Sequence, residues 1–266
     1  MTVQEMFNAY KAEIASLHFF DSNCWIGRTN NPMPHYSNTA QDLLQLMDYY
    51  GIEKALVSHM LSRYYHPKAG NELLLNEISS YEKLCGCFIL LPPATEELGS
   101  LEHYIDVMIK ADVCAARIFP NSHNFSTSDW SIGTLLDKLE ERRVPLFIWS
   151  REISWEALHG IARSHPKLPI VMEFCDTEVY WNTRFIFALL KSCRNVFIEV
   201  HKTHLYREID KIVRVFGAER VLFSTYTPVD DPNASLMLVT NGDYPHPDKE
   251  LIAHANLEKL LENVIR

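Results

Sequence analysis

Short runs of apolar residues alternate along the chain with longer segments in which apolar residues recur every three to four positions. β-Branched and aromatic residues dominate the short runs, as is typical of strands buried on both faces. From the second run onward, successive runs begin 24 to 31 residues apart, which leaves room for one strand and one helix each. Eight strands are therefore predicted, at Leu17–Asn23, Lys54–Met60, Leu84–Leu91, Cys114–Pro120, Pro145–Ser150, Pro169–Cys175, Asn195–His201 and Arg220–Tyr226.

The longer segments have the period of amphipathic helices. One additional helix is predicted before the first strand, over Val3–Ser16, and a strongly amphipathic helix over Asp248–Arg266 is predicted after the last. The clearest helices between strands are predicted at Ala40–Tyr50, Leu101–Lys110, Ile132–Arg143, Trp155–His165 and Leu205–Phe216.

This alternation predicts an α/β fold with a parallel sheet, because strands joined by helix-length crossovers pair in parallel. Eight strand–helix units in 266 residues favour a (β/α)₈ TIM barrel. An open doubly wound sheet stays possible, although no Gly-x-Gly-x-x-Gly turn follows a predicted strand. No linker or low-complexity segment divides the chain, so we expect residues 1–266 to form a single domain.

Composition and charge narrow the function classes. The chain has 25 Lys and Arg against 34 Asp and Glu, a net charge of −9, which disfavours nucleic-acid binding and polybasic membrane attachment. No apolar stretch has the length of a membrane helix, and the first residues lack the pattern of a signal peptide. The six cysteines are then expected to be reduced. We expect a soluble, cytoplasmic protein with no nucleic-acid or membrane partner.

Four segments resemble landmarks of a known family. DSNCWIG at residues 21–27 ends the first predicted strand, and MDYYGIEKALV at residues 47–57 leads into the second. GAERVLFSTYTP at residues 217–228 and NLEKLL at residues 256–261 follow near the end of the chain. In this order and spacing they resemble the amidohydrolase-related family, metal-dependent hydrolases and decarboxylases built on a distorted TIM barrel. The resemblance spans essentially the whole chain and implies the same fold.

The metal-binding positions that this resemblance implies on the first strand carry other residues. The family's first strand normally ends in Asp-x-His-x-His-x-Gly, where both histidines bind a divalent metal. Here Asp21 and Gly27 keep the frame, and Asn23 and Trp25 stand at the histidine positions. Asn is a poor metal ligand and Trp is none.

The remaining implied metal ligands are replaced as well. The histidines of the fifth and sixth strands align with Trp149 and Phe174, and the aspartate of the eighth strand aligns with Tyr226. An alignment slip of one residue, to Glu173 or Cys175, would restore one position and leave the others replaced. We therefore expect no metal ion at the family site and no other cofactor.

Polar and aromatic residues at the predicted strand ends favour an anion-accepting pocket, because the carboxyl ends of the strands form the active face of a TIM barrel. Arg117 and Arg151 could hold a carboxylate in bidentate fashion, against an aromatic wall suited to a flat or sugar-like ligand. Alternatively each arginine pairs with a neighbouring acid, for example Arg151 with Glu152 or Glu173, and the aromatic residues fill the pocket. The candidate ligand-binding residues are Asn23, Trp25, Arg117, Trp149, Arg151 and Tyr226.

Three functions remain compatible with the sequence, which leaves open whether the protein is an enzyme. The first is a non-catalytic or strongly diverged family member that binds a small acidic or sugar-like ligand at the barrel mouth. The second is a metal-independent hydrolase of a lactone or similar ester, with Glu173, His201 or Asp230 as the base. The third is a metal-dependent hydrolase whose site is rebuilt elsewhere, for example from His201 and His204. The resemblance also implies self-association, so we expect a homo-oligomer such as a dimer.

Overall fold

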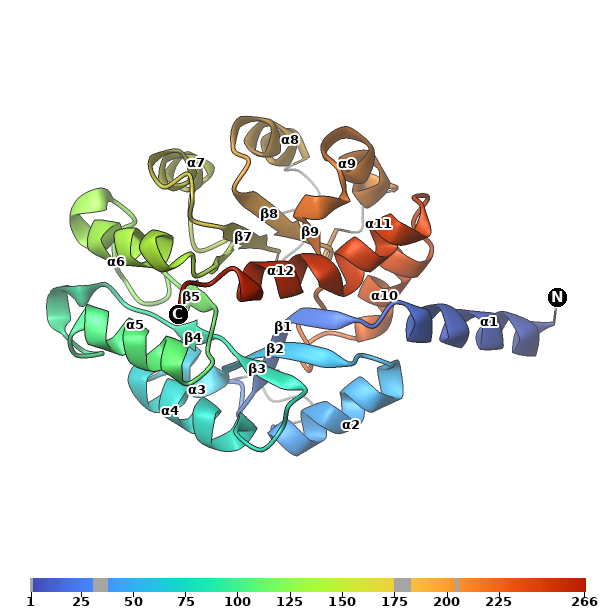
Figure 1. Cartoon of the computed structure of the whole chain (residues 1–266), viewed down its shortest axis with the longest axis horizontal. Coiled ribbons are helices and arrows are strands. Elements are labelled where there is room, and N and C mark those ends of the chain that lie inside the picture. Colours follow the sequence, from blue (N-terminus) through green and yellow to red (C-terminus); the bar gives the residue numbers. More distant parts are fainter. Residues whose placement is uncertain (1, 31–37, 175–182, 204–205) are drawn as a thin grey trace.

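A computed structural model describes residues 2–30, 38–174, 183–203 and 206–266. Within these ranges all strand pairings are parallel, and helices surround the strands (Figure 1). The strands pair in chain order in two sheets, one of three strands and one of six. This arrangement is the α/β barrel that the alternation predicts. The strands are β1 (Phe20–Ile26), β2 (Lys54–His59), β3 (Leu84–Gly86), β4 (Phe88–Ile89), β5 (Ala116–Ile118), β6 (Leu146–Trp149), β7 (Ile170–Glu173), β8 (Val196–Glu199) and β9 (Val221–Leu222).

Backbone hydrogen bonds join the two sheets into a TIM barrel. The amide of Trp25 in β1 donates to the carbonyl of Thr227, beyond β9, at 2.8 Å. The third predicted strand is interrupted between β3 and β4, and there the amide of Cys87 donates to the carbonyl of Val57 in β2 at 2.8 Å. The first strand thus pairs with the segment after the last one, as a barrel requires.

Most helices lie on the outside of the strands, while α12 lies across one end of the barrel and α1 extends away from it (Figure 1). The predicted helices at Val3–Ser16, Ala40–Tyr50 and Leu101–Lys110 are confirmed, and the helix predicted at Trp155–His165 is confirmed to within one residue. The helix predicted at Ile132–Arg143 begins three residues earlier, at Asp129. The helices between the first strand and the end of the barrel are α2 (Ala40–Tyr50), α3 (Met60–Tyr64), α4 (Pro67–Ile78), α5 (Leu101–Lys110), α6 (Asp129–Arg142), α7 (Trp155–Ser164), α8 (Thr183–Ser192), α9 (Glu208–Phe216) and α10 (Pro232–Thr240). The helices near the two ends of the chain are α1 (Val3–Ser16), α11 (His246–Glu250) and α12 (Asn256–Glu262).

Several predicted boundaries are wrong. The first strand begins at Phe20, because Leu17 caps α1 and His18 has a left-handed φ of 50°. The C-terminal helix is broken by a π-helical turn at Leu251–Ala255 and ends at Glu262. No bounds were predicted for helices α3, α4, α8 and α10. The predicted ends at Cys175 and Leu205 lie outside the described residues.

The inward-facing side chains form three layers, as in other barrels of this type. An apolar layer at one end packs against Leu257 and Leu260 of α12. A charged layer lies in the middle, and an aromatic layer lies at the carboxyl ends of the strands, which we call the mouth. The first layer includes Phe20, Leu56, Phe147 and Leu222, the middle layer Ser58, Arg117, Glu173 and Glu199, and the mouth Trp25, Ile89, Phe119, Trp149 and Tyr226.

Two expectations from composition concern the whole molecule. In the parts of the chain that the structure describes, no helix has the length and apolar character needed to cross a membrane. The five cysteines in those parts are free thiols, as expected, and Cys175 lies outside them.

Candidate functional site

Arg117, at the centre of the barrel, is fully buried and bonded on every side. Its Nε and Nη2 donate to the two carboxylate oxygens of Glu173 in β7, at 3.0 and 2.6 Å. Its Nη1 donates to Ser58 Oγ at 2.6 Å, and Nη2 also reaches the carbonyl of Ser22 at 3.3 Å. Arg117 thus pairs with Glu173. The sequence offered this kind of pairing, an arginine with an acid of the same chain, as the alternative to ligand binding.

A third buried group, Glu199 in β8, completes this charged layer. Ser22 Oγ donates to its Oε1 at 2.9 Å, and Asn23 Nδ2 donates to its Oε2 at 3.3 Å. Burial, reinforced by the charge of Glu173, raises the pKa of Glu199 well above its ordinary value and so favours the protonated carboxyl group. Burial also raises the pKa of Glu173, an effect that Arg117 opposes.

The predicted aromatic residues come together at the mouth. The ring centroids of Trp25 and Trp149 lie 6.1 Å apart, and those of Trp149 and Tyr226 lie 5.2 Å apart, in edge-to-face contacts. Trp25 is fully buried, and its Nε1 donates to Asn23 Oδ1 at 2.7 Å. These rings therefore pack against one another and fill the centre of the mouth.

Arg63, in α3, is a site residue that the sequence did not single out. Its guanidinium carbon lies 3.5 Å from the ring centroid of Trp149 and 4.2 Å from that of Phe119. The side chain is only 10% exposed, yet Nε and Nη1 have no hydrogen-bond partner among the described residues. The available signal was its place four residues after β2, at the mouth of the barrel.

The neighbours of Arg63 leave these N–H groups unsatisfied. Arg63 Nη2 lies 4.0 Å from Glu152 Oε1, beyond hydrogen-bond distance, and the amide and hydroxyl of Ser122 already donate to that carboxylate. His123 Nε2 donates to the carbonyl of Arg63 at 2.7 Å, and burial lowers the pKa of His123, which keeps the ring neutral. The Nε1 of Trp149 is also buried without a partner among the described residues. The mouth thus holds several unsatisfied donors around one cation.

The three predicted bases are already engaged. His201 Nε2 contacts Asp230 Oδ2 at 2.8 Å, and His201 Nδ1 donates to the carbonyl of Phe174 at 2.8 Å. Although burial opposes ionisation, hydrogen bonds from His201 and Lys202 lower the pKa of Asp230 to about 2. The third base, Glu173, is held by Arg117. The structure therefore brings His201 and Asp230 together, with both ring nitrogens bound to oxygen atoms.

Arg151 lies apart from the buried layer. It follows β6, its side chain is exposed, and its backbone carbonyl accepts a hydrogen bond from Asn121 Nδ2 at 2.6 Å. Arg117 is fully buried. The two arginines expected to grip one carboxylate thus lie in different environments.

On β7 the expected register is off by one residue. Phe174 packs with the apolar residues between the strands and the outer helices, whereas Glu173 faces the barrel interior. Because side chains alternate along a strand, a shift of one residue exchanges the inward and outward positions. Glu173, and not Phe174, therefore occupies the interior position that the sequence alignment assigned to a metal ligand.

Few donor atoms of the described interior side chains are free to hold a divalent metal ion. Among the described residues, no group of three or more His, Cys, Asp or Glu side chains is placed to hold one. Asn23 Oδ1 accepts from Trp25, and both oxygens of Glu173 accept from Arg117. The guanidinium also places a fixed positive charge where it would repel a second cation.

Comparison with known proteins supports the fold and identifies a family. A family model described as Amidohydrolase matches residues 34–262. No curated protein matches the chain. Among solved structures, 2,6-dihydroxybenzoate decarboxylase from Rhizobium is 15% identical, with a TM-score of 0.72 over 92% of this chain and 98% of that one. These values establish a shared fold.

Two further solved structures have the same architecture. A dihydroxybenzoic acid decarboxylase from Polaromonas, described with bound manganese and the inhibitor 2-nitroresorcinol, is 12% identical, with a TM-score of 0.71 over 92% of this chain and 96% of that one. A Pseudomonas putida protein named for 2-pyrone-4,6-dicarboxylic acid hydrolase activity is 13% identical, with a TM-score of 0.68 over 94% of this chain and 99% of that one.

Proposed function

The chain belongs to the amidohydrolase family, and we propose that it is a strongly diverged, non-catalytic member that binds a small organic acid at the barrel mouth without a metal ion. The observation that carries this proposal is that Arg63 is buried with incomplete hydrogen bonding. Its guanidinium is nine-tenths buried against Trp149, and two of its nitrogen atoms have no partner in the described part of the chain.

A carboxylate is the ligand class that this guanidinium favours. A buried N–H group without an acceptor costs about 1–3 kcal/mol, so an acceptor that reaches Arg63 recovers that free energy. Carboxylate oxygens accept several hydrogen bonds at once and form charge-assisted bonds with arginine. Because Trp25 is fully buried beneath the mouth, the acid would bind at the rim and not deep in the barrel.

The same geometry argues against hydrolysis. A general base must offer a lone pair to a substrate or a water molecule. Both nitrogens of His201 are bound to oxygen atoms, Asp230 is a weak base with a pKa of about 2, and Glu173 is held by Arg117. Family relatives described as decarboxylases include one with manganese, but the donors that would hold an ion here bond to other side chains.

Calorimetric titration with benzoate, and with benzamide as its neutral counterpart, tests the binding proposal. We expect saturable binding of benzoate or of another small carboxylate in the same panel, no binding of the matched amide, and loss of binding in Arg63→Met. Arg151→Met is the control, since this exposed arginine lies outside the proposed contact. Equal binding by Arg63→Met, or equal affinity for acid and amide, would refute the proposal.

Metal content tests the second part of the proposal, that the protein works without a metal ion. We expect far less than one equivalent of zinc or manganese in protein purified without chelator from supplemented medium. Near-stoichiometric metal that survives gel filtration would overturn the proposal in favour of a metal-dependent hydrolase with a rebuilt site. Turnover of a lactone panel by metal-free protein would instead establish the metal-independent hydrolase.

A further inference from the structure

Helix α1 carries an apolar face that its own chain leaves exposed. Val3, Met6 and Phe7 are 83%, 55% and 53% exposed, and they follow the i, i+3, i+4 spacing of one helix face. Figure 1 shows α1 extending outward from the barrel, with the N-terminus at its far end. The exposed face therefore lies on the half of the helix that points away from the rest of the molecule.

The inner half of α1 is firmly attached. Ile14 is buried in the main core, Glu13 pairs with Lys249 at 3.0 Å, and Lys11 donates to the carbonyl of Tyr49 at 3.2 Å. A Thr2–Glu5 capping box completes the outer end of the helix. The helix is thus a well-formed arm with a fixed base, and its apolar tip contributes little to the fold of its own chain.

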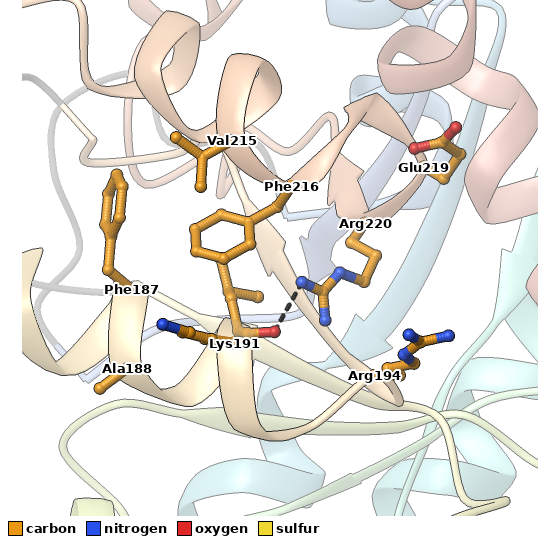
Figure 2. A pocket seen from close by; sticks show the side chains of 9 residues that line it. Phe187, Ala188, Lys191, Arg194, Val215, Phe216, Glu219 and Arg220 are labelled. Carbon is orange, nitrogen blue, oxygen red and sulfur yellow. Dashed lines mark hydrogen bonds between the residues drawn. The ribbon is translucent and has the colours of Figure 1, made fainter.

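A groove between α8 and α9 has the complementary character. Its volume is about 860 Å³. Phe187, Phe216 and Val215 form one side, and the two rings lie 5.2 Å apart (Figure 2). Lys191 and Arg194 bring positive charge to a chain whose net charge is −9. One carboxylate, Glu219, also lines the groove, so the lining is apolar with a net positive charge on a protein that is acidic as a whole.

The third cation of the groove has a structural task. Arg220 donates from Nη1 to the carbonyl of Cys193 and from Nη2 to that of Leu190, both at 2.7 Å, and thereby caps the end of α8. Figure 2 shows one of these bonds as a dashed line from the guanidinium. These bonds link the end of α8 to the residue that precedes β9. Lys191 and Arg194 remain as the cations to vary without disturbing this cap.

We propose that the α8–α9 groove of one copy of this chain receives the tip of α1 from a second copy. A groove of about 860 Å³ has room for the side chains along one face of two helical turns, a segment about 11 Å long. Val3, Met6 and Phe7 supply the apolar anchors expected of a helix that lies in a groove. Glu5, the acidic residue of the tip, complements Lys191 and Arg194.

The exchange closes on itself as a dimer. Each copy offers one arm and one groove, so two copies related by a twofold axis satisfy both contacts and leave neither open. The surface involved is separate from the mouth residues of the proposed function. Loss of acid binding at Arg63 would therefore leave this proposal standing, and loss of the dimer would leave acid binding standing.

Sedimentation velocity of the full chain over a wide concentration range tests the proposal. We expect a monomer–dimer equilibrium, with the dissociation constant raised about tenfold or more in Met6→Ser/Phe7→Ser and in Lys191→Glu/Arg194→Glu. All four positions lie at the surface groove or on the exposed tip, so the folded barrel is retained and is verified by its melting curve. Trp130→Ser, which removes an 82% exposed ring from α6, is the matched apolar control, and Lys68→Glu on exposed α4 surface is the charge control.

Mixing the two defective proteins separates arm exchange from other dimers. The tip variant keeps an intact groove and the groove variant keeps an intact tip, so the mixture regains one of the two contacts and dimerises more tightly than either protein alone. An interface that uses identical surfaces on both copies gives no such rescue. A monomer at every concentration, a dimer unaffected by either double variant, an equal loss in the controls, or no rescue on mixing would each overturn the proposal.

Discussion

Two arginines inside the same barrel show what burial alone does not reveal. Arg117 lies 5.0 Å from the ring centroid of Trp25, and Arg63 lies 3.5 Å from that of Trp149. Arg117 is fully buried and its nitrogens all donate to protein oxygens, whereas Arg63 is 10% exposed with Nε and Nη1 unpartnered in the described chain. Both arginines are largely buried, but only Arg117 has all its guanidinium nitrogens satisfied, and an unsatisfied buried N–H group such as those of Arg63 calls for an explanation.

The difference follows from the acids that each arginine meets. Glu173 reaches Arg117 from two strands away, and both of its oxygens are committed there. The nearest acid to Arg63, Glu152, is held by Ser122 and stays 4.0 Å away. The barrel thus neutralises the cation at its centre with its own carboxylate, whereas Nε and Nη1 of the cation at its mouth meet no acceptor among the described residues.

The largest change in the free energy of unfolding is expected for Arg117→Met. Removing the guanidinium leaves Glu173 buried without its partner, and breaking a buried pair in this way costs about 3–5 kcal/mol of unfolding free energy. Urea denaturation at neutral pH measures the loss. Arg117→Met/Glu173→Gln should be less destabilised than the single variant, because the unpaired charge is gone. A loss below about 1 kcal/mol in the single variant would show that Arg117 is not a structural tie.

A smaller, pH-dependent effect is expected for Glu199→Gln. Because burial raises the pKa of Glu199 in the folded protein, the unfolded chain releases this proton first as the pH rises above about 4.5. Stability from the protonated form is complete below that pH and is lost as the pH rises. Glutamine resembles the protonated acid, so the variant should match the wild type near pH 4 and gain stability toward pH 8.

The size of this gain follows from the pKa shift of Glu199. Each pKa unit between the folded and the unfolded chain corresponds to about 1.4 kcal/mol of unfolding free energy. Denaturant titrations at a series of pH values measure it. Glu82→Gln, at an exposed position, is the matched control and should show no trend. A gain that is constant with pH, or that shrinks as the pH rises, would contradict a protonated Glu199 in the charged layer.

How far the sequence predicts the fold is clear from two helices. The bounds of α2 are predicted correctly, because an amphipathic period is framed by the Thr39 capping box and by Gly51, whose φ is 78°. No bounds were predicted for α4, which contains Gly70, a residue that disfavours helix. A Cβ at Gly70 would lie 2.2 Å from the amide nitrogen of Ser62, so the close contact between α3 and α4 requires glycine there. That contact is tertiary and has no local signal.

Some features of the candidate site are likewise predictable from the sequence, and others depend on tertiary contacts. The convergence of Trp25, Trp149 and Tyr226 follows from their places at strand ends, which meet at one face of the barrel. The pairing of Arg117 with Glu173 joins residues 56 positions apart, and no local pattern specifies which of several acids an interior arginine meets. The unsatisfied state of Arg63 depends equally on what its neighbours already bind, and only the assembled barrel reveals it.

The smallest change in the free energy of unfolding is expected for Arg63→Met, and it is opposite in sign to that of Arg117→Met. Methionine keeps an apolar contact with Trp149 and removes the N–H groups that have no acceptor. Since each unsatisfied buried donor opposes folding, the variant should be as stable as the wild type or about 1 kcal/mol more stable. Glu152 keeps both hydrogen bonds from Ser122, so no new unpaired acid appears.

Urea denaturation of Arg63→Met in the absence of carboxylate ligands measures this change beside that of Arg117→Met. Stability retained together with acid binding lost would separate the two arginines by function, because a residue retained at a cost to folding is explained by what it binds. A loss of several kcal/mol would instead make Arg63 a second structural tie. The distinction between the centre and the mouth of the barrel would then fail, and with it the reason for placing the acid at Arg63.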